Sequence, residues 1–198
     1  MKIVLCDIDG TISWDHKRKH FCANKTGAKI SMKTVRENYS IGKFLTEKQR
    51  KIYYNLTFSN KYTHMDIPRK GAKETLKKLS KKYIIVYFTA RTEKRMKKGT
   101  LEWLKKHNFP YPDNKKVFLF MKSRFNTETK DDVKYKEEAI RKTKELGEPF
   151  ASIDDLSYTK KIYEGAGFKS IIIETPQNST KPGKKVKNWS EIRKKLFI

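Results

Sequence analysis

The stretch IVLCDIDGTI, residues 3–12, decides the fold of this chain. Its apolar run is continuous and does not alternate with polar residues, as in a strand of a parallel sheet that is buried on both faces. Carboxylates are seldom buried without a partner, yet Asp7 ends this run and Asp9 follows two positions later. We therefore expect both acids at the carboxyl edge of a sheet, where open α/β folds bind their ligands.

Further apolar segments recur along the chain, and helical stretches separate them. Together with the first, they predict strands at residues 2–8, 83–91, 116–121, 150–156 and 170–175. Apolar residues at helical spacing lie between the strands, as at Ala72, Leu76 and Leu79. Strands that alternate with helices form crossover units, so we expect an α/β fold with a parallel sheet and helices on both of its faces.

Residues 13–64 interrupt this alternation with basic and aromatic residues and short helical stretches. We therefore divide the 198-residue chain into a core, residues 1–12 and 65–198, and an insert, residues 13–64. The insert has two interpretations. It is either a small helical lid with a Tyr, Phe and Leu core and a lysine-covered surface, or a surface whose rings stack on nucleic-acid bases while its cations hold phosphates.

The net charge of +25 is the main anomaly of the composition. The 47 Lys and Arg residues face only 22 Asp and Glu residues, so ion pairing cannot absorb the excess. Such a surface attracts nucleic acid or phosphorylated substrates, unless the lysine content only reflects the background composition of the source.

Hydropathy and cysteine content bear on the compartment. The sequence has no run of about 18 apolar residues, so we expect no membrane span. Its two cysteines, Cys6 and Cys22, make no disulfide framework. A reducing, cytoplasmic setting is therefore expected.

Three of the predicted strands end in polar side chains. These are Asp7 and Asp9 after the first strand, Thr89 and Arg91 after the second, and Asp154 and Asp155 after the fourth. The carboxyl ends of parallel strands meet at one edge of a sheet, where clustered carboxylates repel one another unless a cation binds. A few carboxylate oxygens suit Mg²⁺, which also takes substrate phosphate. The sequence thus predicts Mg²⁺ held by Asp7, Asp9, Asp154 and Asp155.

Four motifs carry a family resemblance. DIDGT, FTAR, a downstream lysine and IDD resemble motifs I to IV of the haloacid dehalogenase (HAD) superfamily. The resemblance covers nearly the whole chain except the insert. It implies a Rossmann-like core with magnesium, a small and mainly helical cap inserted between motifs I and II, and phosphoryl transfer through an aspartyl-phosphate.

The same resemblance assigns roles to individual residues. Asp7 would be the nucleophile, and Asp9 would protonate the leaving oxygen and then take a proton from water. Thr89 matches the hydroxyl that holds a phosphoryl oxygen. Arg18, in the insert, lies close enough to Asp9 in sequence to be a further candidate for binding the substrate phosphate.

A finer resemblance concerns the segment that begins at TAR. With EWLKKH and MKSRFNTETKDDVKYKEEAI after it, this segment is similar to the 3′-phosphatase domain of phage polynucleotide kinases. By that similarity Arg91 contacts substrate phosphate, and Asp132, or else Asp131, orients active-site groups. Lys136 would be the motif III lysine, with Lys134 as its rival. The chain has no phosphate-binding P-loop motif, so the kinase half is absent.

These observations lead to one main functional hypothesis and two alternatives. The main hypothesis is a magnesium-dependent phosphatase that acts on nucleic-acid 3′-phosphate ends or on nucleotides. The first alternative is a 5′-nucleotidase-like phosphatase of free mononucleotides. The second is a non-catalytic module that binds nucleic acid through its charge, which clustered carboxylates would oppose.

Overall fold

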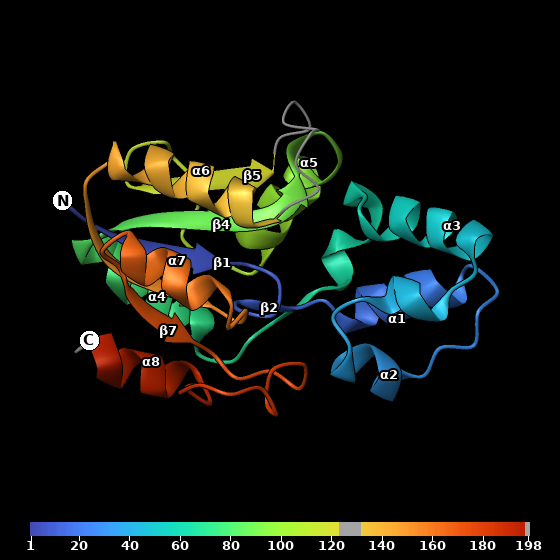
Figure 1. Ribbon diagram of the computed structural model, residues 1–198. Coiled ribbons are helices and arrows are strands. Elements are labelled where there is room, and N and C mark those ends of the chain that lie inside the picture. The colour runs from blue at the N-terminus through green and yellow to red at the C-terminus, as the bar shows by residue number, and fades with distance from the viewer. Residues whose placement is uncertain (123–131, 197–198) are drawn as a thin grey trace.

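The structure is a computed structural model that describes residues 1–122 and 132–196. Its main element is a five-stranded parallel sheet in the order β5-β4-β1-β6-β7 (Figure 1). The strands are β1 (Lys2–Asp7), β4 (Ile84–Thr92), β5 (Val117–Lys122), β6 (Glu148–Asp154) and β7 (Lys169–Ile172). All five match predicted strands, so the expected parallel α/β sheet is confirmed.

Strand β1 lies in the middle of the sheet and is buried on both faces. Val4 and Cys6 belong to one hydrophobic core, whereas Ile3 and Leu5 belong to another. Because successive side chains of a strand point to opposite faces, both faces of β1 need apolar residues. This explains the continuous apolar run that opens the sequence.

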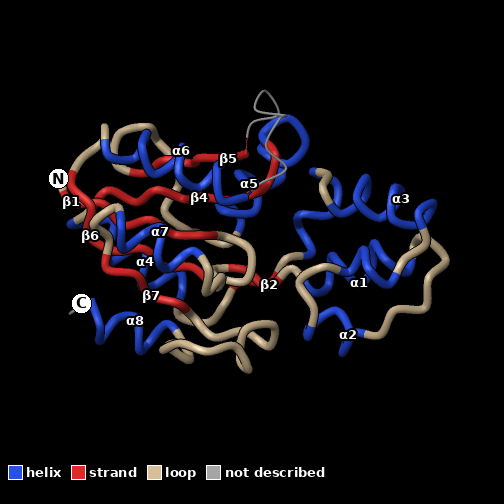
Figure 2. Tube along the Cα trace, in the orientation of Figure 1, coloured by secondary structure: helices blue, strands red, loops and turns tan. Residues whose placement is uncertain are grey.

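Helices cover both faces of the sheet (Figure 2). The core that contains Val4 also takes residues from α4 (Ala72–Lys82), α5 (Glu93–Lys106) and α8 (Trp189–Leu196). The core that contains Ile3 takes residues from α6 (Asp132–Lys144) and α7 (Thr159–Gly165). Across the two described ranges, no helix has the length and apolar character needed to cross a membrane.

The insert folds into a helical lobe beside the sheet, at the edge where β1 ends (Figure 1). Its elements are α1 (His16–Asn24), α2 (Met32–Glu37), the 3₁₀ helix η1 (Ile41–Phe44), α3 (Glu47–Thr57) and the 3₁₀ helix η2 (Asn60–Met65). A small core holds these elements together, with Val35, Ile41, Leu45 and Tyr53 among its buried residues. The lobe is thus a helical cap with its own core, although aliphatic residues contribute as much as rings.

Two short strands connect this cap to the core. β2 (Ser13–Trp14) pairs antiparallel with β3 (Ile67–Pro68), one on each side of the insert. Near this ribbon, η2 packs closely on α5 at Gly99. A Cβ placed at Gly99 would lie 2.5 Å from Thr63 Oγ1 and 2.8 Å from the carbonyl oxygen of Asn60. Gly99 is therefore required by the contact between cap and core, although glycine lowers helix propensity there.

Candidate active site

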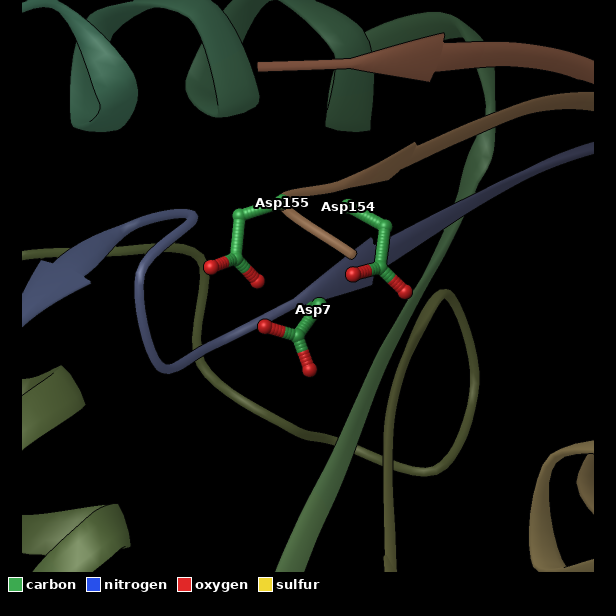
Figure 3. A group of neighbouring side chains, drawn as sticks. All are labelled: Asp7, Asp154 and Asp155. Carbon is green, nitrogen blue, oxygen red and sulfur yellow. The ribbon is translucent and has the colours of Figure 1, made fainter. Parts of the chain in front are cut away.

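The carboxyl ends of β1 and β6 lie side by side, and three acids meet there. Asp7 ends β1, Asp154 ends β6, and Asp155 follows it. One carboxylate oxygen from each residue lies within 4.8 Å of the others (Figure 3). All three side chains are buried. The structure thus brings together three of the four predicted metal ligands, and we call these three residues the acidic triad.

The acidic triad carries more negative charge than its surroundings offset. The Nζ atom of Lys136 lies 2.6 Å from Asp154 Oδ2. This lysine brings one positive charge to a group of three carboxylates. Burial and the neighbouring Asp154 raise the pKa of Asp7 well above its ordinary value, and they raise the pKa of Asp155 to about 8. A divalent cation would offset this charge, and an all-oxygen donor set suits Mg²⁺. The triad therefore fits Mg²⁺.

Asp154 is fixed by three donors. Lys136 and the hydroxyl of Tyr163 both donate to its Oδ2, each over 2.6 Å, and the backbone N–H of Leu156 donates to Oδ1 over 2.9 Å. With its side chain fully buried, Asp154 cannot move without breaking these bonds. This arrangement gives the triad one rigid member.

Lys136 is itself almost fully buried. Its Nζ lies 5.3 Å from the centre of the Phe88 ring, at a distance typical of a cation–π contact. Although burial opposes its charge, the carboxylates of Asp154 and Asp7 raise the pKa of Lys136, so the ammonium group stays charged. The structure therefore places the lysine predicted for motif III at the acidic triad.

The side chains of three other predicted site residues lie outside the part of the chain that the structure describes. Asp131 lies outside the described residues, and so do the side chains of Asp132 and Lys134. The backbone of Asp132 forms the first residue of α6.

The side chain of Asp9 faces two arginines. Arg91 donates to it from Nε over 2.8 Å and from Nη2 over 2.6 Å, and Arg18 donates from Nη2 over 3.1 Å. Burial opposes the ionisation of Asp9, but Arg91 and Arg18 lower its pKa far below the ordinary value. The Asp9 carboxylate lies outside the acidic triad, and its part in metal binding stays a prediction.

Asp66 completes this arrangement and was not anticipated from the sequence. It accepts hydrogen bonds from Arg18 Nε over 2.8 Å and from Arg91 Nη2 over 2.6 Å, and it is buried. We call Asp9, Arg18, Asp66 and Arg91 the arginine–aspartate network. Arg18 lies in the cap and Arg91 in β4, so the network joins cap to core. The sequence signal for Asp66 is weak, because it is a lone acid just after the insert.

The turn after β1 brings its backbone close to the acidic triad. Gly10 has φ +80°, and a Cβ at this position would lie 2.4 Å from Asp155 Oδ2. Both the backbone angle and the contact therefore require glycine. On β4, Thr89 is buried and its hydroxyl accepts the backbone N–H of Arg91 over 3.2 Å.

A cavity of about 440 Å³ lies between the core and the cap. From the core, its lining includes Asp7, Asp9, Thr89, Arg91, Lys136 and Asp155. From the cap, it includes Arg18, Lys19, Tyr39, Tyr53, Tyr54 and Phe58, and the segment after β7 adds Gln177 and Lys181. Most of the residues predicted for catalysis or binding therefore surround one space, whose wall in the cap includes aromatic rings among polar and charged side chains.

Solved structures with a similar fold include hydrolases of the HAD superfamily. A haloacid dehalogenase-like hydrolase, SP0104 from Streptococcus pneumoniae, is 15% identical, with a TM-score of 0.72 over 98% of this chain and 97% of its own. A putative phosphatase from Clostridium difficile is 19% identical, with a TM-score of 0.65 over 98% and 97%. A chain of the Pnkp1/Rnl/Hen1 complex is 17% identical, with a TM-score of 0.51 over 86% of this chain and 44% of its own. These likenesses show the Rossmann-like HAD fold.

A search of curated proteins found no match. The family model described as PITM 1-3, LNS2 domain matches residues 51–168. The match begins within α3 of the cap and ends after α7, so it includes Thr89, Lys136 and Asp154, whereas Asp7 and Asp9 precede it. Because it covers more than half of the 198 residues, it establishes the family. The chain belongs to the PITM 1-3, LNS2 domain family, which has a HAD-like fold.

Proposed function

We propose that this protein is a Mg²⁺-dependent phosphomonoester hydrolase that acts through an aspartyl-phosphate on Asp7. One observation carries the proposal: Asp7 belongs to the acidic triad and lines the same cavity as Lys136 and Thr89. In-line transfer of a phosphoryl group needs a carboxylate nucleophile and positive charge beside it, together with hydrogen-bond donors for the phosphoryl oxygens. The HAD fold and the four motifs add support.

The reaction would run in two displacements. An oxygen of Asp7 attacks phosphorus, the bond from phosphorus to the leaving oxygen breaks, and Asp9 gives its proton to that oxygen. Water then attacks the phosphorus of the aspartyl-phosphate and gives a proton to Asp9. The bond between phosphorus and Asp7 breaks, so inorganic phosphate leaves and both acids return to their starting state.

The arginine–aspartate network would set the charge of Asp9. While Arg91 and Arg18 bind it, Asp9 is ionised, which is the form that accepts the proton of water. The first displacement needs the protonated form. We infer that both guanidinium groups turn from Asp9 to the phosphate when substrate binds, which is the role predicted for Arg91 and Arg18 from the sequence.

The acidic triad would hold the metal. Mg²⁺ bound there supplies positive charge against the phosphate and favours the ionised form of Asp7. Lys136 offsets the charge of Asp154, and the hydroxyl of Thr89 would hold a phosphoryl oxygen. These residues would thus allow a carboxylate to approach a phosphate dianion.

The proposed substrates are nucleic-acid 3′-phosphate ends or nucleotides. The net charge of +25 supports a polyanion or a phosphorylated ligand. The second candidate is a 5′-nucleotidase-like phosphatase, which the position of the cap favours because cap residues form one wall of the cavity. A module that only binds nucleic acid is disfavoured, because the buried carboxylates of the triad would repel such a ligand.

The test is phosphate release at near-physiological salt, with and without Mg²⁺. Three substrates separate the candidates: an oligonucleotide with a 3′-phosphate, adenosine 3′-monophosphate and adenosine 5′-monophosphate. We expect Asp7→Asn to lower turnover at least about a thousandfold, because it removes the nucleophile. Asp113→Asn is the matched control, since Asp113 lies in the loop between α5 and β5 and should leave turnover unchanged.

Each outcome decides between the candidates. Preference for the oligonucleotide, with a KM that rises steeply with salt, supports action on nucleic-acid ends. Preference for one of the mononucleotides supports a small substrate. The absence of Mg²⁺-dependent release from any phosphate ester would overturn the proposal, and so would full turnover by Asp7→Asn.

A further inference from the structure

Two exposed aromatic rings line the cavity from the cap. Tyr54 lies near the end of α3 and Phe58 follows its last residue, so the two are one helical turn apart. Their ring centres are 5.8 Å apart and their planes differ by 28°. The two side chains are 37% and 38% exposed, although neighbouring Tyr53 is buried in the cap. Two stacked rings that stay open to a cavity are suited to contact a ligand.

The tip of the Tyr54 side chain is held in place by its contact with Gly42. A Cβ at Gly42 of η1 would lie 2.4 Å from the Tyr54 hydroxyl oxygen, so the tip of the ring packs directly on this glycine. Arg50, also on α3, donates to the carbonyl oxygens of Gly42 and Leu45 over 3.0 and 3.3 Å. These bonds fix η1 against α3 and give the ring a defined position before a ligand binds.

The proposed catalytic residues and the two rings line the same cavity. Asp7 and Lys136 line it from the core, while Tyr54 and Phe58 line it from the cap. Its volume of about 440 Å³ lies in the range of roughly 300–1,000 Å³ found for small-molecule sites. A ligand with a phosphate at one end and a flat ring at the other would match both walls.

The polar lining favours a base over an acyl chain. The side chains of Gln177 and His16 lie 3.2 Å apart and both line the cavity, as does Lys181, whose Nζ lies 4.9 Å from the Tyr39 ring centre. An acyl chain would cover these groups without bonding to them, which is costly. A nucleobase has donors and acceptors on its edges and π-faces on which tyrosine and phenylalanine stack.

We propose that Tyr54 and Phe58 form a subsite that stacks on the base of a phosphorylated nucleoside, with its phosphate directed to Asp7. This inference rests on the proposed function and deepens it, because it names the part of the substrate that the cap recognises. The subsite takes either a free nucleotide or the terminal nucleotide of a strand.

The test measures binding separately from catalysis. In full-length Asp7→Asn protein with Mg²⁺, calorimetry gives the Kd of adenosine 3′- and 5′-monophosphate and of two esters without a base, ribose 5-phosphate and 2-glycerophosphate. We expect at least one adenosine ester to bind about tenfold or more tightly than the esters without a base. Tyr54→Leu and Phe58→Leu should each lose most of this preference. Tyr111→Leu, at an exposed tyrosine outside the cavity lining, should keep it.

A fourth variant tests the ring's position without removing it. Gly42→Ala should weaken the preference, because its methyl group displaces the Tyr54 ring. The subsite is overturned if no adenosine ester binds more tightly than the esters without a base, or if both ring variants keep the preference. Phosphate release by the wild-type protein is followed in parallel. Release from every ester without base preference overturns the subsite alone, whereas absence of release overturns the proposed hydrolase.

Discussion

Arg18 of the cap and Asp66, just after the insert, form a buried ion pair, with Nε 2.8 Å from Oδ1. Arg18 also donates to the backbone carbonyl oxygen of Thr57 over 2.6 Å and to Asp9 over 3.1 Å. One cap side chain therefore bonds to α3, to the chain that returns from the cap, and to the turn after β1. This residue couples the folding of the cap to the geometry of the candidate active site.

Replacing Arg18 should destabilise the whole protein. Arg18→Met leaves the buried carboxylate of Asp66 and the partly exposed carboxylate of Asp9 with Arg91 as their shared partner. The removal of one member of a buried ion pair typically costs about 3–5 kcal/mol, and we expect a loss of that size in urea unfolding.

The control is an arginine in a surface pair. Arg141 on α6 pairs with Glu145, the residue after the helix ends, and their side chains are 70% and 68% exposed. Arg141→Met should change the free energy of unfolding by less than about 1 kcal/mol. Similar losses from the two variants would contradict the role assigned to the arginine–aspartate network.

The turn after β1 gives a second prediction. Gly10→Ala combines an unfavourable positive φ with a clash at Asp155, because the new Cβ would lie 2.4 Å from Oδ2. The variant should therefore lose Mg²⁺ affinity and turnover in addition to stability, as measured by calorimetry and phosphate release.

A variant at Gly27 separates the effect of the positive φ from the effect of the clash with Asp155. Gly27 has φ +83°, and a Cβ there would meet nothing within 4 Å. Gly27→Ala should show the backbone effect alone, about 1–2 kcal/mol, with unchanged turnover. If Gly10→Ala binds Mg²⁺ as tightly as Gly27→Ala does, the close approach of Gly10 to the triad has no functional importance.

The buried triad predicts how stability depends on pH. Burial and Asp154 raise the pKa of Asp155 to about 8, from the ordinary value of 3.8. The folded, metal-free protein therefore binds more protons than the unfolded chain between these values, so this group makes stability fall as pH rises from about 4 to about 8. The Asp155→Asn variant lacks this carboxyl group and therefore its titration. Without metal, its Tm relative to wild type should thus increase from about pH 5 to about pH 8.

Added Mg²⁺ should diminish this trend, because a bound cation replaces the proton on the carboxylate. Asp113→Asn is the control, since hydrogen bonds from the backbone N–H groups of Val117, Lys115 and Lys116 lower the pKa of Asp113 to about 2. Its Tm relative to wild type should stay constant over the same range. A constant difference for Asp155→Asn as well would show that Asp155 is not buried as an acid.

Much of the core was predictable from the sequence for local reasons. Strands β1, β4 and β6 contain largely apolar runs that end in polar side chains, and glycine or proline lies near several strand ends. β6 begins earlier than predicted, at Glu148, because Glu148 and Pro149 pair with Lys2 and Ile3 of β1, before a register shift between the two strands. A proline two residues after a glycine, as at Gly147 and Pro149, resembles a loop in sequence, and only the pairing with β1 shows that this proline lies in a strand.

The cap and the network were less predictable. Helix α1 buries His16 and Arg18 beside Cys22 and Ala23, so it lacks the apolar stripe that marks an amphipathic helix. Asp66 and Arg18 are 48 positions apart, and a single sequence gives no sign of their pairing. The members of the acidic triad were predictable as strand ends. The bonding of Asp9 to Arg18 depends on a contact between cap and core that no local pattern contains.

The most direct test of the account is to look for a phosphoryl group on Asp7. The wild-type protein is mixed with Mg²⁺ and its best phosphate ester, quenched in acid within one turnover, and digested for mass spectrometry. We predict a phosphorylated peptide that contains Asp7 and is absent from Asp7→Asn and from samples treated with hydroxylamine, which cleaves acyl phosphates. Rapid turnover with Asp7 unmodified at every time point, or full turnover by Asp7→Asn, would contradict the account.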